Sequence, residues 1–491
     1  MFHWVKKTWG GLLASVLGLF AVASACADSG DGRSYGPLYD KFDLTLTPGQ
    51  RTEIAGPLYY SQKTEDSTLW AIPPFYSHYK NAGTDSEEWD FFYPVMTYDR
   101  FGTEHRWQFF QLFNVSGGMS TRAGEDETKK RYEVFPIYFH QSSTVPTNNY
   151  TAVIPFYGHL QNKLFRDDLF FVMMPIYIQS RKDDIYTYNY FYPFVHVRYG
   201  DALHGWQVWP LVGHQHKDPT IQTNGFSEVS TNGGHDKLFV LWPFFHQQTL
   251  GEGTVNRSFE QAFLPLYYFM RSPMRDQTTV IWPFFSFIND REKKYREWQL
   301  PFPFVDFARG SKTTDRILPL FSRSHNATLE ADDYLWPIYK YNRVHSGPLD
   351  RDRTRILLYL FSDVHEKNLE THQMLHRVDF FPFFTWRKDF NGNSRLQILS
   401  ILDPILPNNK SIERDWDPVY SFWRQEKNPR TGASSQSLFW NLYRHESTPV
   451  TKKCSLLFGL FQYQSDGDGR RLRLFFIPVM KTHPHVTQPT P

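Results

Sequence analysis

Short runs of apolar and aromatic residues alternate with polar segments along nearly the whole chain. The run Trp282-Pro283-Phe284-Phe285 shows the recurring unit: an apolar residue, a proline, a second apolar residue and an aromatic one. From Pro265 to Pro337 the anchoring prolines are 18 residues apart at every step. The pattern therefore predicts a tandem repeat of about 23 units of about 18 residues each. The prolines that anchor such units are Pro37, Pro57, Pro74, Pro94, Pro136, Pro155, Pro175, Pro193, Pro210, Pro243, Pro265, Pro283, Pro301, Pro319, Pro337, Pro382, Pro418 and Pro478.

Each unit has the composition of a β-strand. Around Pro337 an aromatic and β-branched run is bounded by polar, turn-prone residues, as in strands. Apolar residues occupy both parities at the centre of the unit, so we expect strand centres that are buried on both faces. Proline cannot donate to a ladder, and we interpret it as a bend or bulge at a shared level of each strand. The residues predicted to form the packed core of the repeat are Trp282, Pro283, Phe284, Phe285, Trp336, Pro337 and Tyr339.

The connections between units predict an all-β, antiparallel fold. Many are short and carry turn chemistry, as in Asp466-Gly467-Asp468-Gly469, which favours hairpins. A flat open sheet of about 23 strands would accumulate twist and expose its edges. We therefore expect closure into a toroid, either propeller-like or a shallow barrel with splayed hairpins. A β-solenoid would need stricter spacing, whereas a transmembrane β-barrel remains the main alternative.

The N-terminus predicts export. Lys6 and Lys7 precede an apolar run that ends in Ala23-Ser24-Ala25, the pattern of a secretory signal peptide. We divide the chain into a signal peptide (1–25), an anchor cysteine with a polar tether (26–36), one continuous β-repeat domain (37–480) and a disordered tail (481–491).

The segment Val22-Ala23-Ser24-Ala25-Cys26 resembles the signal of bacterial lipoproteins, although Ala23 stands where that family usually has leucine. The resemblance implies a lipid on Cys26 and attachment to a membrane. Ala27, rather than aspartate, follows the cysteine, which by the same resemblance implies the outer membrane. The alternative is ordinary cleavage after Ala25. The other cysteine, Cys454, lies in an apolar run and is predicted to be a small core residue.

Charge and composition narrow the partners. Lys plus Arg (53) nearly balances Asp plus Glu (51), so nothing in the charge favours nucleic acid. Aromatic residues make up 18% of the chain, and their fixed place beside proline favours a packing role. A glycan, a lipid or another envelope protein remains as the partner class.

The sequence nominates no catalytic site. His214 and His216 would lie on one side of a strand, which suits a metal ion, but nothing nominates a third ligand. His372 and His376 have helical spacing without the His-Glu-x-x-His order of metalloproteases. We expect no cofactor and no catalysis. The expected function is an exported, lipid-anchored binding or structural scaffold of the bacterial cell envelope, and the alternatives are an outer-membrane pore and an envelope glycan-active enzyme.

Overall fold

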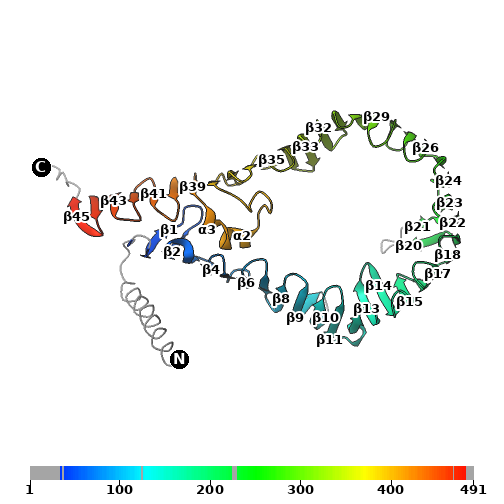
Figure 1. The fold of residues 1–491 in the computed structure, drawn as a ribbon, viewed down its shortest axis with the longest axis horizontal. Coiled ribbons are helices and arrows are strands. Elements are labelled where there is room, and N and C mark those ends of the chain that lie inside the picture. The colour runs from blue at the N-terminus through cyan, green and yellow to red at the C-terminus, as the bar shows by residue number, and fades with distance from the viewer. Residues whose placement is uncertain (1–33, 36–37, 123–124, 224–228, 468, 483–491) are drawn as a thin grey trace, which may run out of the picture.

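The computed structural model describes residues 34–35, 38–122, 125–223, 229–467 and 469–482. These residues form one antiparallel sheet of 43 strands and a separate two-stranded sheet (Figure 1). Strands hold 62% and helices 4% of the residues, which confirms the all-β prediction. The predicted signal peptide, Cys26 and the tail after Thr482 lie outside the described residues.

The strands of the first half of the sheet lie in chain order. They are β1 (Asp40–Asp43), β2 (Gly49–Ile54), β3 (Tyr59–Thr64), β4 (Ser67–Ile72), β5 (Tyr76–Asn81), β6 (Ser86–Phe91), β7 (Met96–Phe101), β8 (Glu104–Phe109), β9 (Phe113–Arg122), β10 (Glu125–Val134), β11 (Tyr138–Ser143), β12 (Tyr150–Val153), β13 (Tyr157–Lys163), β14 (Arg166–Val172), β15 (Tyr177–Lys182), β16 (Ile185–Tyr190), β17 (Val195–Gly200), β18 (Leu203–Val208), β19 (Val212–Lys217), β22 (Gly234–Val240), β23 (Phe245–Glu252) and β24 (Ser258–Phe263).

The second half continues in the same order. Its strands are β25 (Tyr267–Arg271), β26 (Arg275–Val280), β27 (Phe285–Asp290), β28 (Tyr295–Gln299), β29 (Val305–Gly310), β30 (Thr313–Ile317), β31 (Phe321–His325), β32 (Leu329–Tyr334), β33 (Tyr339–Ser346), β34 (Leu349–Ile356), β35 (Phe361–Asn368), β36 (Met374–Phe380), β37 (Phe384–Lys388), β38 (Ser394–Ile398), β39 (Trp423–Asn428), β40 (Ala433–Leu438), β41 (Tyr443–Ser447), β42 (Lys452–Leu456), β43 (Phe461–Asp466), β44 (Gly469–Leu474) and β45 (Ile477–Thr482).

The remaining elements interrupt this series. The hairpin β20 (Thr220–Thr223) and β21 (Val229–Asn232) forms the second sheet, and α2 (Lys410–Asp415) and α3 (Asp417–Tyr420) lie between β38 and β39. Two single turns of 3-10 helix, η2 (Gly56–Leu58) and η3 (Pro146–Asn148), replace ordinary connections.

The main sheet is a meander in which strands pair with their neighbours in sequence. Thr279 of β26, for example, lies opposite Tyr268 of β25 on one side and Ser286 of β27 on the other. Strand β19 pairs directly with β22, so the β20–β21 hairpin stands outside the sheet. Among the described strands, β1 pairs only with β2 and β45 only with β44. No strand ladder therefore joins the two ends of the described sheet.

The proline units are turns and not strand centres. Residues 281–284 connect β26 to β27, the Phe284 N–H donates to the Ile281 carbonyl at 2.9 Å, and the Trp282–Pro283 bond is cis. Each unit of about 18 residues therefore holds two strands, which corrects the expectation of about 23 strands and of a bend inside each. Proline fits here because it has no backbone N–H, and at this turn position no N–H is needed for a hydrogen bond between strands. Among the described anchors, Pro57 lies in η2, Pro418 in α3 and Pro478 in β45. Pro37 lies outside the described residues.

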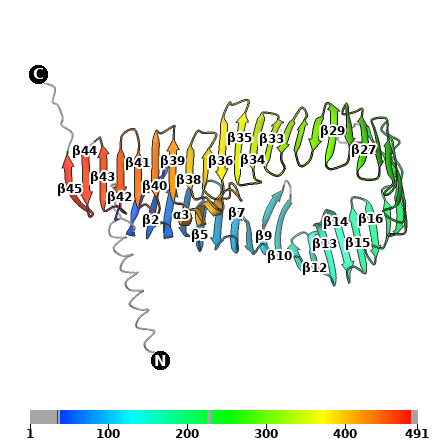
Figure 2. The same cartoon turned by 45° about the horizontal axis from the view of Figure 1, so that its top comes forward.

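Successive proline turns hydrogen-bond to one another along one edge of the sheet. The Ile281 N–H donates to the Leu266 carbonyl at 2.8 Å, and the Leu335 N–H donates to the Leu320 carbonyl at 2.7 Å. The turns thus prolong the ladder beyond the strand ends. Figure 2 shows the strands side by side with their connections gathered at two edges.

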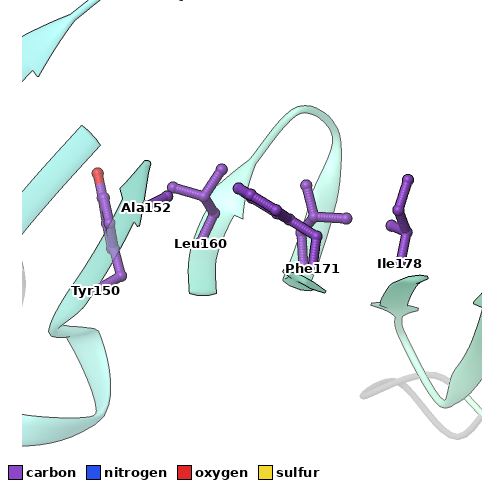
Figure 3. Packing of buried hydrophobic residues seen from close by; sticks show 6 residues of the cluster. Tyr150, Ala152, Leu160, Phe171 and Ile178 are labelled. Carbon is purple, nitrogen blue, oxygen red and sulfur yellow. The ribbon is translucent and has the colours of Figure 1, made fainter. Parts of the chain in front are cut away.

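The ribbon bends round until its ends lie next to each other, with β1 and β2 beside β39 and β41 (Figure 1). We call the face on which the ends meet the inner face, and it includes Thr279 and Ser286; the opposite face is the outer face. Small residues are buried on the inner face: Ala152, Ala262 and Ala308 have no exposed surface. Its largest apolar cluster is formed by Tyr150, Ala152, Leu160, Leu169, Phe171 and Ile178 (Figure 3).

Candidate functional site

The two ends of the sheet meet in side-chain contacts, which we call the seam. Arg444 of β41 lies over the ring of Phe42 in β1, with its guanidinium carbon 3.1 Å from the ring centre. Asn441 donates to the Glu53 carboxylate at 2.7 Å. Asn428 donates to the Thr45 carbonyl at 3.2 Å. These residues are more than 380 positions apart in sequence, so no local pattern announces the seam.

The helices α2 and α3 fill the seam. Asn409 caps α2, since its side-chain oxygen accepts from the Ile412 N–H at 3.2 Å, and Pro418 suits the first turn of α3. The Asn409 amide also donates to the Tyr93 hydroxyl at 2.8 Å. Trp416 donates its indole N–H to the Tyr93 carbonyl at 3.0 Å. A segment that stands in place of one proline turn thereby reaches the other end of the sheet.

Buried charges concentrate where α2 meets β6. Arg414 donates to Glu88 at 2.5 Å and to Asp90 at 2.8 Å, and its carbonyl accepts from the Tyr60 hydroxyl at 2.8 Å. These ion pairs raise the pKa of the Arg414 guanidinium, although its burial acts in the opposite direction. Burial, followed by the charge of Asp90, raises the pKa of Asp415 to about 8. The seam therefore contains buried charges that are paired around Arg414.

A cavity of about 350 Å³ opens on the inner face beside α2. Burial and the neighbouring Arg355 and Arg351 lower the pKa of Arg353, which lines it. Other arginines there have carboxylate partners: Arg377 pairs with Asp379 at 2.9 Å. Much of the positive charge that lines this cavity is thus already paired with carboxylates of the protein.

The proline-turn edge exposes apolar side chains, and we call it the rim. Phe191 is 62% exposed, Trp336 57% and Phe284 42%. Among the seven residues predicted to form a core, Trp282, Phe284, Trp336 and Pro337 are exposed and the other three are half-buried. Turn residues belong to neither face of the sheet, so an apolar residue of either parity projects outward there. The rim consists of residues 73–75, 92–95, 110–112, 135–137, 154–156, 173–176, 191–194, 209–211, 241–244, 264–266, 281–284, 300–304, 318–320, 335–338, 357–360, 381–383, 439–442, 457–460 and 475–476.

The outer face changes in character with distance from the rim. Next to the rim it carries residues such as Val280 and Phe285, and one position further up Phe287 lies opposite Trp298. Beyond that level polar residues follow, as where Asn289 lies opposite Arg296. Aromatic rings contact one another at the middle level: the ring centres of Tyr98 and Trp107 are 4.6 Å apart.

Outside the apolar cluster around Phe171, the inner face is largely polar, and several of its charges are paired. Lys312 lies 3.0 Å from Glu297, and Arg316 lies 3.5 Å from Asp306. Burial, together with the charge of Glu297, raises the pKa of Asp306 to about 6. The sheet therefore separates an apolar rim and outer band from a polar inner face.

The histidines considered as ligands lie on the outer face of β19. Asp236 accepts from His214 Nε2 and from His216 Nδ1, each at 3.1 Å, and His216 Nε2 lies 3.2 Å from Asp218. These carboxylates raise the pKa of His216. In the described residues one group has ligand atoms that all lie within 4.8 Å of one another, namely Asp363, His365 and His376.

Two other sequence-based expectations concern single residues. His376 lies in strand β36 and His372 in the loop before it, so the pair has no helical arrangement. Cys454 lies in β42, half-buried, and burial raises the pKa of its thiol.

In the part of the chain that the structure describes, no helix combines the length and the apolar character that crossing a bilayer requires. A comparison with models of known protein families finds no match, and a comparison with curated proteins finds no relative of this chain.

Proposed function

We propose that this protein is a non-catalytic scaffold of the bacterial cell envelope, held to a membrane by its apolar rim. The observation that supports the proposal is the long series of exposed apolar turns along one edge of the sheet, interrupted where α2 and α3 replace a proline turn. Soluble proteins rarely expose a contiguous apolar patch of more than a few hundred Å². A rim that enters the lipid surface would remove this area from water, which is favourable by about 25 cal/mol per Å².

The order of residues on the outer face supports shallow insertion. A six-residue strand rises roughly 20 Å, and only its rim end is apolar. An apolar surface of this height matches the 5–10 Å to which interfacial elements enter a membrane, and aromatic residues are favoured at the boundary above it. A spanning barrel needs an apolar band of about 25 Å. The polar inner face is the observation that favours the pore alternative, and the height of the strands disfavours it.

A lipid on Cys26 would complete the attachment. Acyl chains contribute about 0.8 kcal/mol per buried CH₂, and the rim would add its own apolar area to this attachment. The same reasoning leads us to propose export and an outer-membrane location for the chain.

We further propose that the sheet closes into a toroid through the seam. A path of 43 strands is roughly 200 Å long at about 4.8 Å per strand. Closure by side chains at the seam would place the rim from β4 to β40 in one ring against the membrane, with β43 to β45 continuing past the seam (Figure 1).

Flotation with lipid vesicles tests the proposal. A chain with Cys26→Ser carries no acyl group and isolates the contribution of the rim. We expect this protein to float with vesicles of phosphatidylethanolamine and phosphatidylglycerol. Introducing Phe191→Glu, Leu241→Glu and Phe284→Glu into it should weaken binding at least tenfold, because each exposed apolar side chain would be lost to a charge.

The matched control is Phe165→Glu. Phe165 is 98% exposed but lies between β13 and β14 at the edge opposite the rim, so its substitution should leave flotation unchanged. Equal loss in both variants, or no flotation of the Cys26→Ser protein, would refute rim attachment. If the protein without rim substitutions releases a dye trapped inside the vesicles, the result would favour the pore alternative.

A further inference from the structure

Asp363, His365 and His376 form a cluster on the outer face of β35 and β36. His376 Nε2 lies 2.8 Å from Asp363 Oδ1, and His365 Nε2 lies 3.9 Å from the same oxygen. The two imidazole rings are 4.0 Å apart between centres. Three groups that commonly bind metal ions therefore face one point.

Strand register produces this arrangement. His365 and His376 lie directly opposite each other in the ladder, and such cross-strand partners have Cβ atoms about 4.5–5.5 Å apart. His214 and His216 also share one carboxylate, Asp236. Within the described residues, however, only Asp363, His365 and His376 form a group whose ligand atoms all lie within 4.8 Å of one another.

The distances fit a small tetrahedral ion. Zinc binds histidine nitrogen and carboxylate oxygen at about 2.0–2.2 Å, which places neighbouring ligand atoms roughly 3.4 Å apart. The separations of 2.8 and 3.9 Å lie on either side of that value. The side chains of Asp363, His365 and His376 are about one-third exposed, so an ion has access and a water molecule can fill the fourth position.

A supporting carboxylate lies behind the cluster. His365 Nδ1 is 3.1 Å from Asp352 Oδ2, and Asp352 lies opposite His365 in the ladder. A histidine that binds zinc through one ring nitrogen usually donates its other N–H to a carboxylate, which fixes the ring. Asp352 thereby leaves Nε2 of His365 directed at Asp363. Trp386 packs its ring edge-on against His376, 4.8 Å between centres.

We propose that Asp363, His365 and His376 bind one divalent transition-metal ion of the zinc class, with Asp352 as a positioning residue. The ion would join β35 to β36 on the outer face. This site is independent of the rim and of membrane attachment.

Zinc binding by the full chain, purified in detergent and freed of metal with a chelator, tests the proposal. His483→Gln and His485→Gln are included in every sample, so that the histidines of the tail do not contribute. We expect one Zn²⁺ per chain by titration calorimetry. His365→Ala and His376→Ala should each weaken binding at least tenfold, and Asp352→Asn should weaken it 10- to 100-fold.

His214→Ala is the matched control, because it removes an outer-face histidine that also contacts a carboxylate. Its affinity for Zn²⁺ should equal that of the parent protein. Cobalt gives a second readout, since the visible spectrum of four-coordinate Co²⁺ should appear in the parent and vanish in His376→Ala. No stoichiometric binding, or equal loss in the His214→Ala control, would overturn the site. Circular dichroism confirms that each variant is folded, and Asp363→Asn replaces any that is not.

Discussion

At the residue scale, Asp415 is the most perturbed carboxyl group of the seam. It lies at the end of α2 without exposed surface, next to Asp90 and Arg414. Burial raises its pKa from 3.8 to about 8, so the protonated form is favoured at neutral pH. Burial also raises the pKa of Asp40 and of Asp403 to about 6. All three shifts have the same consequence for stability.

Stability should fall as pH rises. A carboxyl whose pKa is higher in the folded than in the unfolded protein binds more protons when folded, so ionisation costs stability between the two values. For Asp415 this window extends from about pH 4 to pH 8. Asp415→Asn should flatten the pH dependence and raise the melting temperature relative to the parent at pH 9, with little difference at pH 4. Each pKa unit corresponds to about 1.4 kcal/mol. Calorimetry at both pH values measures the effect, and equal pH slopes in the two proteins would contradict it.

Burial at single positions follows distance from the turn more than hydrophobicity. Trp282 and Phe284 are exposed, while Thr279 and Ser286 are buried and hydrogen-bonded to each other at 2.9 Å. Sequence reasoning assigned the aromatic residues to the core because apolar residues of both parities suggest burial on two faces. Apolar residues of both parities also occur at a turn, where the chain leaves the sheet. Only the position of the strand ends distinguishes an exposed turn from a strand centre that is buried on both faces.

At the element scale, the strands of the main sheet are hydrogen-bonded to their neighbours in the meander. A segment inserted between two strands therefore leaves the sheet intact when the two strands still pair directly. Strands β19 and β22 form a regular ladder from Val212 opposite Val240 to Lys217 opposite His235. The β20–β21 hairpin between them belongs to a different sheet and exposes Ile221 and Val229.

Removal of residues 220–232 should therefore leave the main sheet intact. We expect the melting temperature to change by no more than about 2 °C, because the ladder between β19 and β22 remains whole. Thermal unfolding followed by circular dichroism measures the change. Deletion of residues 401–420, which include α2 and α3, is the comparison and should destabilise the protein strongly. Equal effects of both deletions would show that the hairpin carries structure of its own.

The sequence predicted some elements and not others, for local reasons. Repetition, antiparallel hairpins and the all-β class follow from composition and turn residues near each strand. The number of strands does not follow, because a proline unit has the composition of a strand centre and is in fact the turn between two strands. The cluster of Asp363, His365 and His376 depends on register across two strands, which spacing alone does not give.

At the scale of the whole molecule, the ends are joined by side chains and not by a ladder. Arg414 contributes the most concentrated contact, with both Glu88 and Asp90 as partners. The residues of the seam cannot be predicted from local sequence patterns, because contacts such as that between Tyr60 and Arg414 join positions 354 residues apart.

Arg414→Ala should open the proposed toroid. Removing one partner from a buried ion pair costs about 3–5 kcal/mol, because the remaining charge stays buried and unpaired. We expect a larger radius of gyration by small-angle X-ray scattering and a lower melting temperature. Arg309→Ala is the control: Arg309 pairs with Asp315 at 2.5 Å on the half-exposed outer face, and such pairs contribute about 0–1 kcal/mol. An unchanged radius, with stability equal to the control, would argue against the seam as the closure.

The order of the strands in the meander also affects how the chain can fold during its synthesis. Each strand of the sheet finds its partner among the residues synthesised just before or just after it, so hairpins can form one by one as the chain emerges. The contacts of Phe42, Tyr60 and Tyr93 wait for partners that come hundreds of residues later. A chain truncated before these partners would thus form its hairpins and still lack the contacts of the seam. Closure of the proposed toroid would therefore follow the formation of these hairpins and depend on residues as late as Arg444.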